Sequence, residues 1–350
     1  MVKKRAEIAH QKNEHLDLCS TDSVAFRQRT TLLEDVQLLH QSLPELSLDE
    51  IDLSVELLGK RLKAPLVIAA MTGGTRKALE INTELAALAE SNGYGFGLGS
   101  QRAMLDSPKM AYTFRVRQRA PNVLLLGNIG VVQARDCATP VLEKLVHEVE
   151  ADALCVHMNP AMEVIQRQGD RNFTRCIETF ARLVRELSIP VVAKETGAGV
   201  STEVARRLSE IGVTTIDVSG AGGTSWVGVE ALRAQGEERE LGELLWDWGI
   251  PTAASIVYAS RCSMNVIATG GIHNGLDVAR SIALGATAAG IARPILQAFQ
   301  KGGRTYAEDF LRRIKRELAV VMLLCGVRTI AELKRVPKVI LGELRHWLNV

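Results

Sequence analysis

Eight short apolar runs recur along the chain from residue 64 onward, and stretches with a helical spacing of apolar positions separate them. Predominantly apolar runs of this length are typical of strands that are buried on both faces. They cover residues 65–70, 95–100, 123–130, 153–159, 190–195, 214–220, 265–271 and 288–293. The intervening amphipathic stretches predict helices, among them residues 78–91, 138–150, 179–187, 201–211 and 276–284. Ser201 suits a helix N-cap, and Gly93 and Gly285 suit helix ends.

This alternation predicts an α/β fold in a single domain over residues 1–350, built as a (β/α)8 TIM barrel. We expect the barrel at residues 64–300, after an N-terminal extension at residues 1–60 and before a last helix and C-terminal helical tail at residues 301–350. A doubly wound sheet is the alternative. Such sheets commonly carry a GxGxxG motif after the first strand, whereas Met71-Thr72-Gly73-Gly74 follows this one.

Two segments outside the regular alternation could face the barrel mouth. The long gap between the sixth and seventh strands contains Trp226, Trp246 and Trp248, and predicts either a lid or a helical insertion packed by its own tryptophans. A short helix is expected from Gln11 to Leu16. There, Lys12 and His15 share one face, which is either solvated or part of a site.

Composition narrows the class of protein. Hydrophobic residues make up 47% of the chain and charged residues 23%, as in ordinary globular proteins. A net charge of +2 and 4% aromatic residues argue against a nucleic-acid partner. The six cysteines form no CxxC pair, and no apolar run is long enough for a membrane span. We therefore expect a soluble, cytoplasmic protein with no membrane partner.

The residues that follow the eight strands share one face of a barrel, where barrel enzymes build their sites. Glycine or hydroxyl residues stand at nearly every one of these strand ends. Glycines allow backbone N–H groups to approach a phosphate closely. The ends of the last two strands, Thr269-Gly270-Gly271 and Gly290 to Arg293, stand where barrels commonly bind phosphate.

Lys194 and Glu195 end the fifth strand, either as a solvated ion pair or as part of the site. A lysine there, together with a phosphate site, favours flavin mononucleotide (FMN), with Lys194 near the N1–C2=O edge of the flavin ring. Asn128 and Ser100 are suited to hydrogen-bond that ring. The rival is pyridoxal phosphate with Lys194 as its Schiff base. Asp217 either orients Lys194 or satisfies backbone donors.

At this point a family resemblance can be stated. The chain resembles type 2 isopentenyl-diphosphate isomerases from about residue 11 to residue 347. The motifs that carry this resemblance are Lys12-x-x-His15-Leu16, Met71-Thr72-Gly73-Gly74, Gly99-Ser100-Gln101-Arg102, His157-Met158-Asn159-Pro160, Gln168-Gly169-Asp170, Lys194-Glu195-Thr196-Gly197 and Gly220-Ala221-Gly222-Gly223-Thr224-Ser225-Trp226. It implies interconversion of isopentenyl and dimethylallyl diphosphate in isoprenoid biosynthesis, with reduced FMN and Mg²⁺ and without net redox change. It also implies NADPH as reductant and a homo-tetramer or homo-octamer.

The resemblance also implies roles for individual residues. FMN would be held by Met71, Thr72, Gly73, Ser100, Asn128, Lys194, Ser219, Thr224, Gly270, Gly271, Ala292 and Arg293. The substrate would be bound by Gln11, Lys12, His15, Arg102, His157, Asn159 and Met162. Glu163 would bind Mg²⁺, and Glu230 and His157 would be the catalytic side chains beside the flavin, which is the expected proton relay. A charged helical residue such as Glu230 is, however, more often solvated.

Two positions depart from the family pattern. Gln11 replaces an arginine, and Met162 replaces a glutamine with a role on the substrate side. A methionine thioether cannot transfer protons. Two alternatives therefore stay open. One is an FMN-dependent barrel oxidoreductase acting on a small hydroxy acid, for which His273 is the nearest histidine to the seventh strand. The other is a flavin- and diphosphate-binding relative with altered catalysis.

Overall fold

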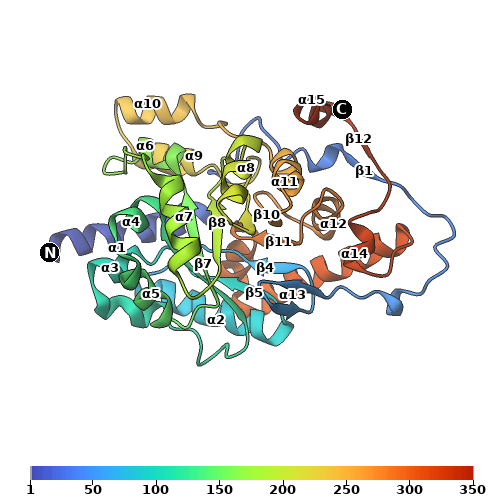
Figure 1. Cartoon of the computed structure of the whole chain (residues 1–350), viewed down its shortest axis with the longest axis horizontal. Helices are drawn as coiled ribbons and strands as arrows, with labels where there is room; N and C mark the ends of the chain where they lie inside the picture. The colour runs from blue at the N-terminus through green and yellow to red at the C-terminus, as the bar shows by residue number, and fades with distance from the viewer. Residues whose placement is uncertain (1, 350) are drawn as a thin grey trace.

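The computed structural model describes the backbone of residues 2–349 and the side chains of residues 10–349. Eight parallel strands close into a barrel, as the apolar runs predict (Figure 1). In order they are β4 (Leu66–Ile68), β5 (Gly95–Gly97), β6 (Leu124–Gly130), β7 (Ala153–Met158), β8 (Val191–Glu195), β9 (Thr215–Asp217), β10 (Asn265–Thr269) and β11 (Ala288–Ile291). The barrel closes where β11 pairs with β4. The doubly wound alternative is thereby wrong.

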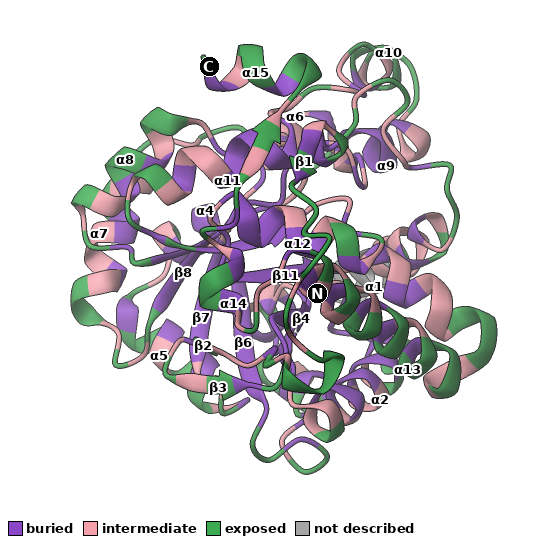
Figure 2. Cartoon of the chain, turned by 90° about the vertical axis from the view of Figure 1, so that its right-hand side faces the viewer, coloured by how far each residue is buried: buried purple, intermediate pink, exposed green. Residues whose placement is uncertain are grey.

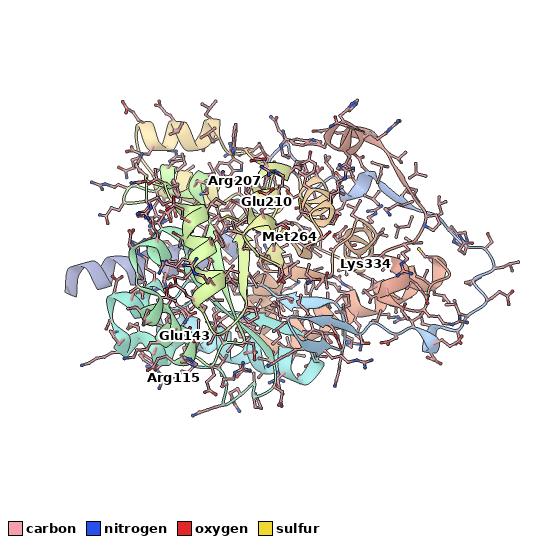
Figure 3. All side chains as sticks on the ribbon, viewed as in Figure 1. Arg115, Glu143, Arg207, Glu210, Met264 and Lys334 are labelled. Atoms are coloured by element: carbon pink, nitrogen blue, oxygen red, sulfur yellow. The ribbon has the colours of Figure 1, made fainter. Side chains whose placement is uncertain are left out.

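Helices surround the strands and bury one face each. The outer helices are α2 (Arg76–Asn92), α4 (Val131–Asp136), α5 (Thr139–His147), α7 (Cys176–Glu186), α8 (Thr202–Glu210), α11 (Thr252–Arg261), α12 (Gly275–Ala283) and α13 (Arg293–Leu324). On α8, Ala205 and Leu208 are buried, whereas Arg207 and Glu210 point outward (Figures 2 and 3). Ser201 caps α8 by accepting a hydrogen bond from the Val204 N–H, as predicted. Gly93 ends α2 in the left-handed conformation, with φ of 68°.

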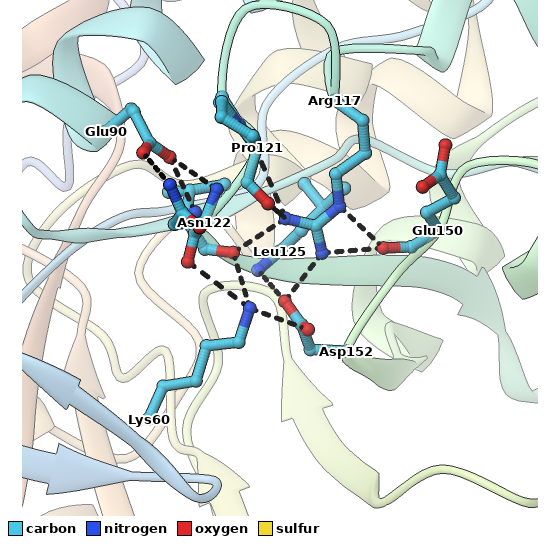
Figure 4. A network of polar contacts seen from close by, with 10 residues as sticks. Lys60, Glu90, Arg117, Pro121, Asn122, Leu125, Glu150 and Asp152 are labelled. Carbon is cyan, nitrogen blue, oxygen red and sulfur yellow. Dashed lines mark hydrogen bonds and ion pairs between the residues drawn. The ribbon is translucent and has the colours of Figure 1, made fainter.

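A hairpin of β2 (Val55–Leu57) and β3 (Lys60–Leu62) closes the barrel at the amino ends of its strands. Leu57 and Leu62 belong to the same apolar cluster as the side chains inside the barrel, which are Val67, Leu124, Leu126, Ala153, Cys155, Val192, Ile267 and Ala288. A polar network fixes the hairpin to the barrel (Figure 4). In it, Asp152 accepts hydrogen bonds from the Leu125 N–H and from Arg117, each at 2.7 Å, and pairs with Lys60. This end of the barrel is filled.

Both ends of the chain lie outside the barrel. The N-terminal segment contains α1 (Val2–Cys19), β1 (Val36–Leu38) and two short 3-10 helices, η1 (Leu33–Asp35) and η2 (Leu48–Glu50). β1 pairs antiparallel with β12 (Lys338–Ile340) of the C-terminal segment. That segment also holds α14 (Ile330–Leu333) and α15 (Gly342–Leu348). The predicted short helix from Gln11 is therefore part of a longer one.

Several loops after the strands carry short helices of their own. They are α3 (Arg102–Asp106), η3 (Pro108–Phe114), α6 (Pro160–Ile165), α9 (Trp226–Arg233) and α10 (Glu237–Leu244). The gap between the sixth and seventh strands thus contains a helical insertion. Trp246 is buried in it and donates a hydrogen bond to the Ala25 carbonyl oxygen, whereas Trp248 is exposed. Among the described residues, no helix is both long and apolar enough to cross a membrane.

Candidate functional site

A cavity of about 650 Å³ lies at the carboxyl ends of the strands. Every residue that the sequence assigns to the site lines it. They come from nearly all strand ends and from α1, α6 and α9: Gln11, Lys12, His15, Met71, Thr72, Gly73, Ser100, Arg102, Asn128, His157, Asn159, Met162, Glu163, Lys194, Ser219, Thr224, Glu230, Gly270, Gly271, Ala292 and Arg293. The geometry brings them together, and their individual roles stay predictions.

Lys194 and Glu195 are both buried, so they are not a solvated pair at a strand end. Because successive side chains of a strand alternate in direction, they also have different partners. The Lys194 Nζ donates to Asp217 Oδ2 at 2.8 Å and to the Glu195 carbonyl oxygen at 3.1 Å. The other Asp217 oxygen accepts a hydrogen bond from the Ser219 N–H at 3.2 Å. Asp217 therefore both contacts Lys194 and satisfies a backbone donor, the two roles that the sequence left as alternatives.

The Glu195 carboxylate organises the loop that follows β8. Its Oε2 lies within 3.1 Å of four consecutive backbone N–H groups, those of residues 196–199. Burial raises the pKa of Glu195 to about 7, although the backbone donors and Lys194 act to lower it. Gly197 and Gly199 have φ of 139° and 74°, which only glycine adopts without strain. Thr196 and Gly197 of this loop line the cavity.

The ends of β10 and β11 fit a phosphate group. Gly270 and Gly271 have φ of 105° and 73°, and a Cβ on Gly270 would collide with the Gly220 carbonyl oxygen. The loops after β9 and β10 therefore pack closely against each other at the edge of the cavity. α13 begins at Arg293, so its first N–H groups also face this region. Among the described residues, Thr72 and Thr269 have buried hydroxyl oxygens without a hydrogen-bond partner, which suits a polar ligand.

Arg293 is held by the N-terminal segment. Its Nη1 donates to the Thr21 carbonyl oxygen and to Asp22 Oδ1, each at 3.2 Å. The side chain is buried, so it lines the cavity with fixed geometry. The segment after α1 thus holds Arg293 in place at the cavity wall.

His157 is held by Asn128. Their Nδ1 and Oδ1 atoms are 2.7 Å apart, and because an amide oxygen can only accept, Nδ1 carries the proton. Burial lowers the pKa of His157 to about 3, with the positive charges of Lys194 and Arg102 adding to the effect. The imidazole is therefore neutral, and among the described residues no polar group contacts its Nε2 lone pair.

Glu163 begins a chain of polar contacts on α6. It accepts hydrogen bonds from Asn159 Nδ2 and from the Asp170 N–H, each at 2.8 Å. Burial raises its pKa. Met162 only receives a weak contact from Asn159, with an Nδ2–Sδ distance of 3.7 Å. Within the described part of the chain, no three His, Cys, Asp or Glu side chains form a metal cluster. Glu163 therefore stays a predicted metal ligand, without a cluster of further ligating side chains around it in the described part of the chain.

α1 brings Lys12 to the mouth of the barrel. Its Nζ lies 3.4 Å from the Ser100 carbonyl oxygen and 5.6 Å from the centre of the Phe114 ring. Burial lowers the pKa of Lys12 to about 8, and the nearby Arg102 contributes to the shift. Two cations, Lys12 and Arg102, therefore lie close together in the wall of the cavity.

Glu230 is 2% exposed, so the alternative of a solvated helix face is wrong. Its Oε1 lies 2.7 Å from His15 Nε2, and its Oε2 lies 2.5 Å from Arg233 Nη1. Sequence reasoning missed Arg233. Its position three residues after Glu230 was the available signal, since such residues are neighbours on a helix. It also missed Gln133, which lines the cavity and donates to Asp170 at 2.6 Å. No motif points to that residue.

The comparisons with known proteins agree with the geometry of the site. The chain matches the FMN-dependent dehydrogenase family over residues 4–111 and 115–338. It is 46% identical over 347 residues to an isopentenyl-diphosphate delta-isomerase from Methanosarcina mazei, covering 97% of this chain and 94% of that protein. The corresponding protein of Pyrococcus abyssi is 44% identical over 352 residues, with 97% and 94% coverage.

Several solved structures share the fold of this chain. A lactate oxidase from Pediococcus acidilactici superimposes with a TM-score of 0.68 at 14% identity, covering 97% of this chain and 94% of that one. A flavocytochrome b2 variant with pyruvate bound gives 0.65 at 21% identity, with 90% and 78% coverage. At these identities the likeness establishes the barrel fold alone. The family follows from the far closer sequence relatives: the chain belongs to the FMN-dependent, type 2 isopentenyl-diphosphate delta-isomerases.

Proposed function

We propose that this protein interconverts isopentenyl diphosphate and dimethylallyl diphosphate while it holds reduced FMN. The observation that carries the proposal is the division of one cavity into two ends. One end has the glycine-rich backbone and the buried Lys194–Asp217 pair, which suit a flavin phosphate and ring. The other has Lys12, Arg102 and Glu163, which suit a diphosphate with its cation. The sequence relatives named for this activity support the same assignment.

FMN would be held by the residues of the first end. Gly270, Gly271 and the start of α13 would bind its phosphate, and the unpartnered hydroxyls of Thr72 and Thr269 would find partners on it. The Lys194 ammonium would lie near the pyrimidine edge of the ring and stabilise negative charge there. Bound in its reduced state, FMN supplies an electron-rich ring that stabilises developing positive charge and can exchange a proton. NADPH is the proposed reductant.

The substrate diphosphate would be bound by the cationic end. Lys12 and Arg102 supply the charge, and Asn159 supplies hydrogen bonds, with Gln11 and His15 at the rim. His157 would serve as a hydrogen-bond partner through its free Nε2. Glu163 would hold Mg²⁺ together with the diphosphate oxygens, because this ion is commonly bound by one or two carboxylates plus substrate phosphates.

Isomerisation adds a proton at one carbon of the substrate and removes a proton from another, so the proton balance is zero. Met162 cannot take part in either transfer. Among the cavity side chains, Glu230 is the proposed acid–base group on the protein, because its carboxylate is buried and engaged by two polar partners. His157, being neutral, would position the substrate.

The alternatives have weaker support. Hydroxy-acid oxidation would need a catalytic histidine. His273 lines the cavity but is exposed, and the named solved structures share only the fold. Pyridoxal phosphate would need a free lysine amine, whereas Lys194 is in an ion pair with Asp217. We further propose a cytoplasmic homo-tetramer or homo-octamer; the six free cysteines support a reducing compartment.

The test uses FMN-loaded protein, reduced with NADPH under anaerobic conditions and incubated with Mg²⁺ and isopentenyl diphosphate in D₂O. We expect dimethylallyl diphosphate with deuterium incorporation and no net consumption of NADPH during turnover. Absence of product with reduced FMN bound would overturn the isomerase proposal. Tight diphosphate binding without product would identify a non-catalytic relative. Reduction of oxidised FMN by lactate or mandelate would identify an oxidoreductase.

A further inference from the structure

Arg233 stands at the end of α9, in the wall of the cavity, and the proposed function gives it no task. Its guanidinium reaches three groups. Nη1 donates to Glu230 Oε2 at 2.5 Å and lies 3.4 Å from His15 Nε2. Nε donates to Glu14 Oε2 at 3.0 Å. Arg233 is therefore the only link shown between the acid–base candidate Glu230 and Glu14 of α1 among the described side chains.

Only one proton can lie between His15 Nε2 and Glu230 Oε1. At 2.7 Å between Nε2 and Oε1, the proton is either on the imidazole, facing a carboxylate, or on the carboxyl group, facing a lone pair. The second arrangement makes Glu230 unable to accept a proton from a substrate. A cation on the other carboxylate oxygen stabilises the first arrangement, because it favours the charged form of the acid. Arg233 supplies that cation.

The other groups that surround the His15–Glu230 pair do not supply this positive charge. Cys19, at the end of α1, is buried, and its thiol pKa is raised to about 12, chiefly by burial. It therefore stays uncharged. Trp226 packs edge-on against His15, with ring centres 5.3 Å apart, and carries no charge. Glu14 contacts Arg233 at 3.0 Å, and no direct contact between Glu14 and Glu230 is found among the described side chains.

We propose that Arg233 is the positioning residue of the His15–Glu230 pair, holding Glu230 as a carboxylate and the shared proton on His15. The catalytic part of this proposal rests on the proposed function. The effect of Arg233 on the protonation of the His15–Glu230 pair can be measured without turnover. Loss of the cation leaves a buried carboxylate facing only His15. The pair then retains a proton to higher pH, whichever of the two atoms carries it.

Four variants test this in the FMN-loaded protein. Arg233→Met removes the cation, and Arg233→Lys keeps the charge without the planar fork. Glu14→Gln removes the negative charge from the α1 partner of Arg233 but leaves Glu230 its cation. Arg239→Met removes an exposed arginine from the next helix as the matched control. The readouts are the NMR titration of the His15 ring, the pH profile of kcat, and the bound FMN spectrum as the check on folding.

For R233M we expect the apparent pKa of the pair to rise by about one unit or more, and kcat to fall on the order of 100-fold, the lower range for loss of acid–base catalysis. R233K should titrate like the unmodified protein, as should E14Q and R239M. An unchanged titration in R233M, or the same shift in E14Q, would overturn the proposal. If R233M does not retain FMN, R233Q tests the same expectation. If the unmodified protein has no isomerase activity but R233M still shows the expected titration shift, the proposed function is wrong and the positioning role of Arg233 stands.

Discussion

The Nζ of Lys194 lies 2.8 Å from Oδ2 of Asp217, and both side chains are buried at the mouth of the barrel. Two charges removed from water are costly, and each is tolerated because the other is present. The pair therefore fixes a positive group beside the proposed flavin site before any ligand arrives.

Replacing Asp217 by Asn should destabilise the flavin-free protein by about 3–5 kcal/mol, the usual cost of leaving one partner of a buried ion pair alone. Urea unfolding at pH 7 measures this loss. The double variant Lys194→Met with Asp217→Asn, which buries no unpaired charge, should recover part of it. Equal stability of D217N and the unmodified protein would contradict a charged pair.

The neutral state of His157 depends on burial and on the cations around it, while Asn128 fixes which nitrogen carries the proton. Asn128→Asp should raise the pKa of His157 from about 3, because a carboxylate then faces Nδ1–H. Asn128→Ala should leave that N–H without a partner, at a cost of about 1–3 kcal/mol. NMR of the His157 ring and urea unfolding measure the two effects. No movement of the His157 resonances in N128D would contradict the contact.

Diphosphate affinity should depend on the charge of Lys12. Its lowered pKa of about 8 means that the ammonium is present below pH 8 and is lost as the pH rises above it. Each further pH unit should weaken binding by up to about tenfold, because binding then requires uptake of one proton. Calorimetry with inorganic diphosphate between pH 6.5 and 9.5 measures the profile. Lys12→Arg should remove the decline, and an unchanged decline in this variant would assign it to another group.

Asp152 should stabilise the closed end of the barrel. Burial raises the pKa of its carboxyl group, but the Leu125 N–H, Lys60 and Arg117 outweigh it, so the net pKa is lowered. The stabilisation is then fully present above the ordinary value of 3.8 and is lost as the pH falls through the lower folded-state pKa.

Asp152→Asn should accordingly cost about 1–3 kcal/mol at pH 7 and less at pH 3, as measured by urea unfolding. Its kinetic constants should match those of the unmodified protein at pH 7, because the side chain lies at the opposite end of the barrel from the cavity. A stability loss that does not shrink at pH 3 would contradict the ionic origin.

The barrel could be predicted because its strands are apolar on both faces, a pattern that few other elements share. The ends of β6 and β8 were predicted correctly, whereas the other strand ends were placed too late. β5 stops at Gly97 and β9 at Asp217, since the following residues leave the ladder to line the cavity. Residues at the strand ends were predictable because the fold alone brings them together. Arg233 and the burial of Glu230 were not, because they depend on how α1 docks against α9.

Helix α1 also has a practical consequence. It begins at Val2 and delivers Lys12 and His15 to the cavity, anchored by the buried side chains of Leu16 and Cys19. The two ends of the chain lie on opposite sides of the molecule (Figure 1). An affinity tag or fusion partner attached before α1 would therefore extend from the helix that completes the site, and could impede ligand exchange. One attached after α15 would stand clear of it, and this is the better design for preparing the protein.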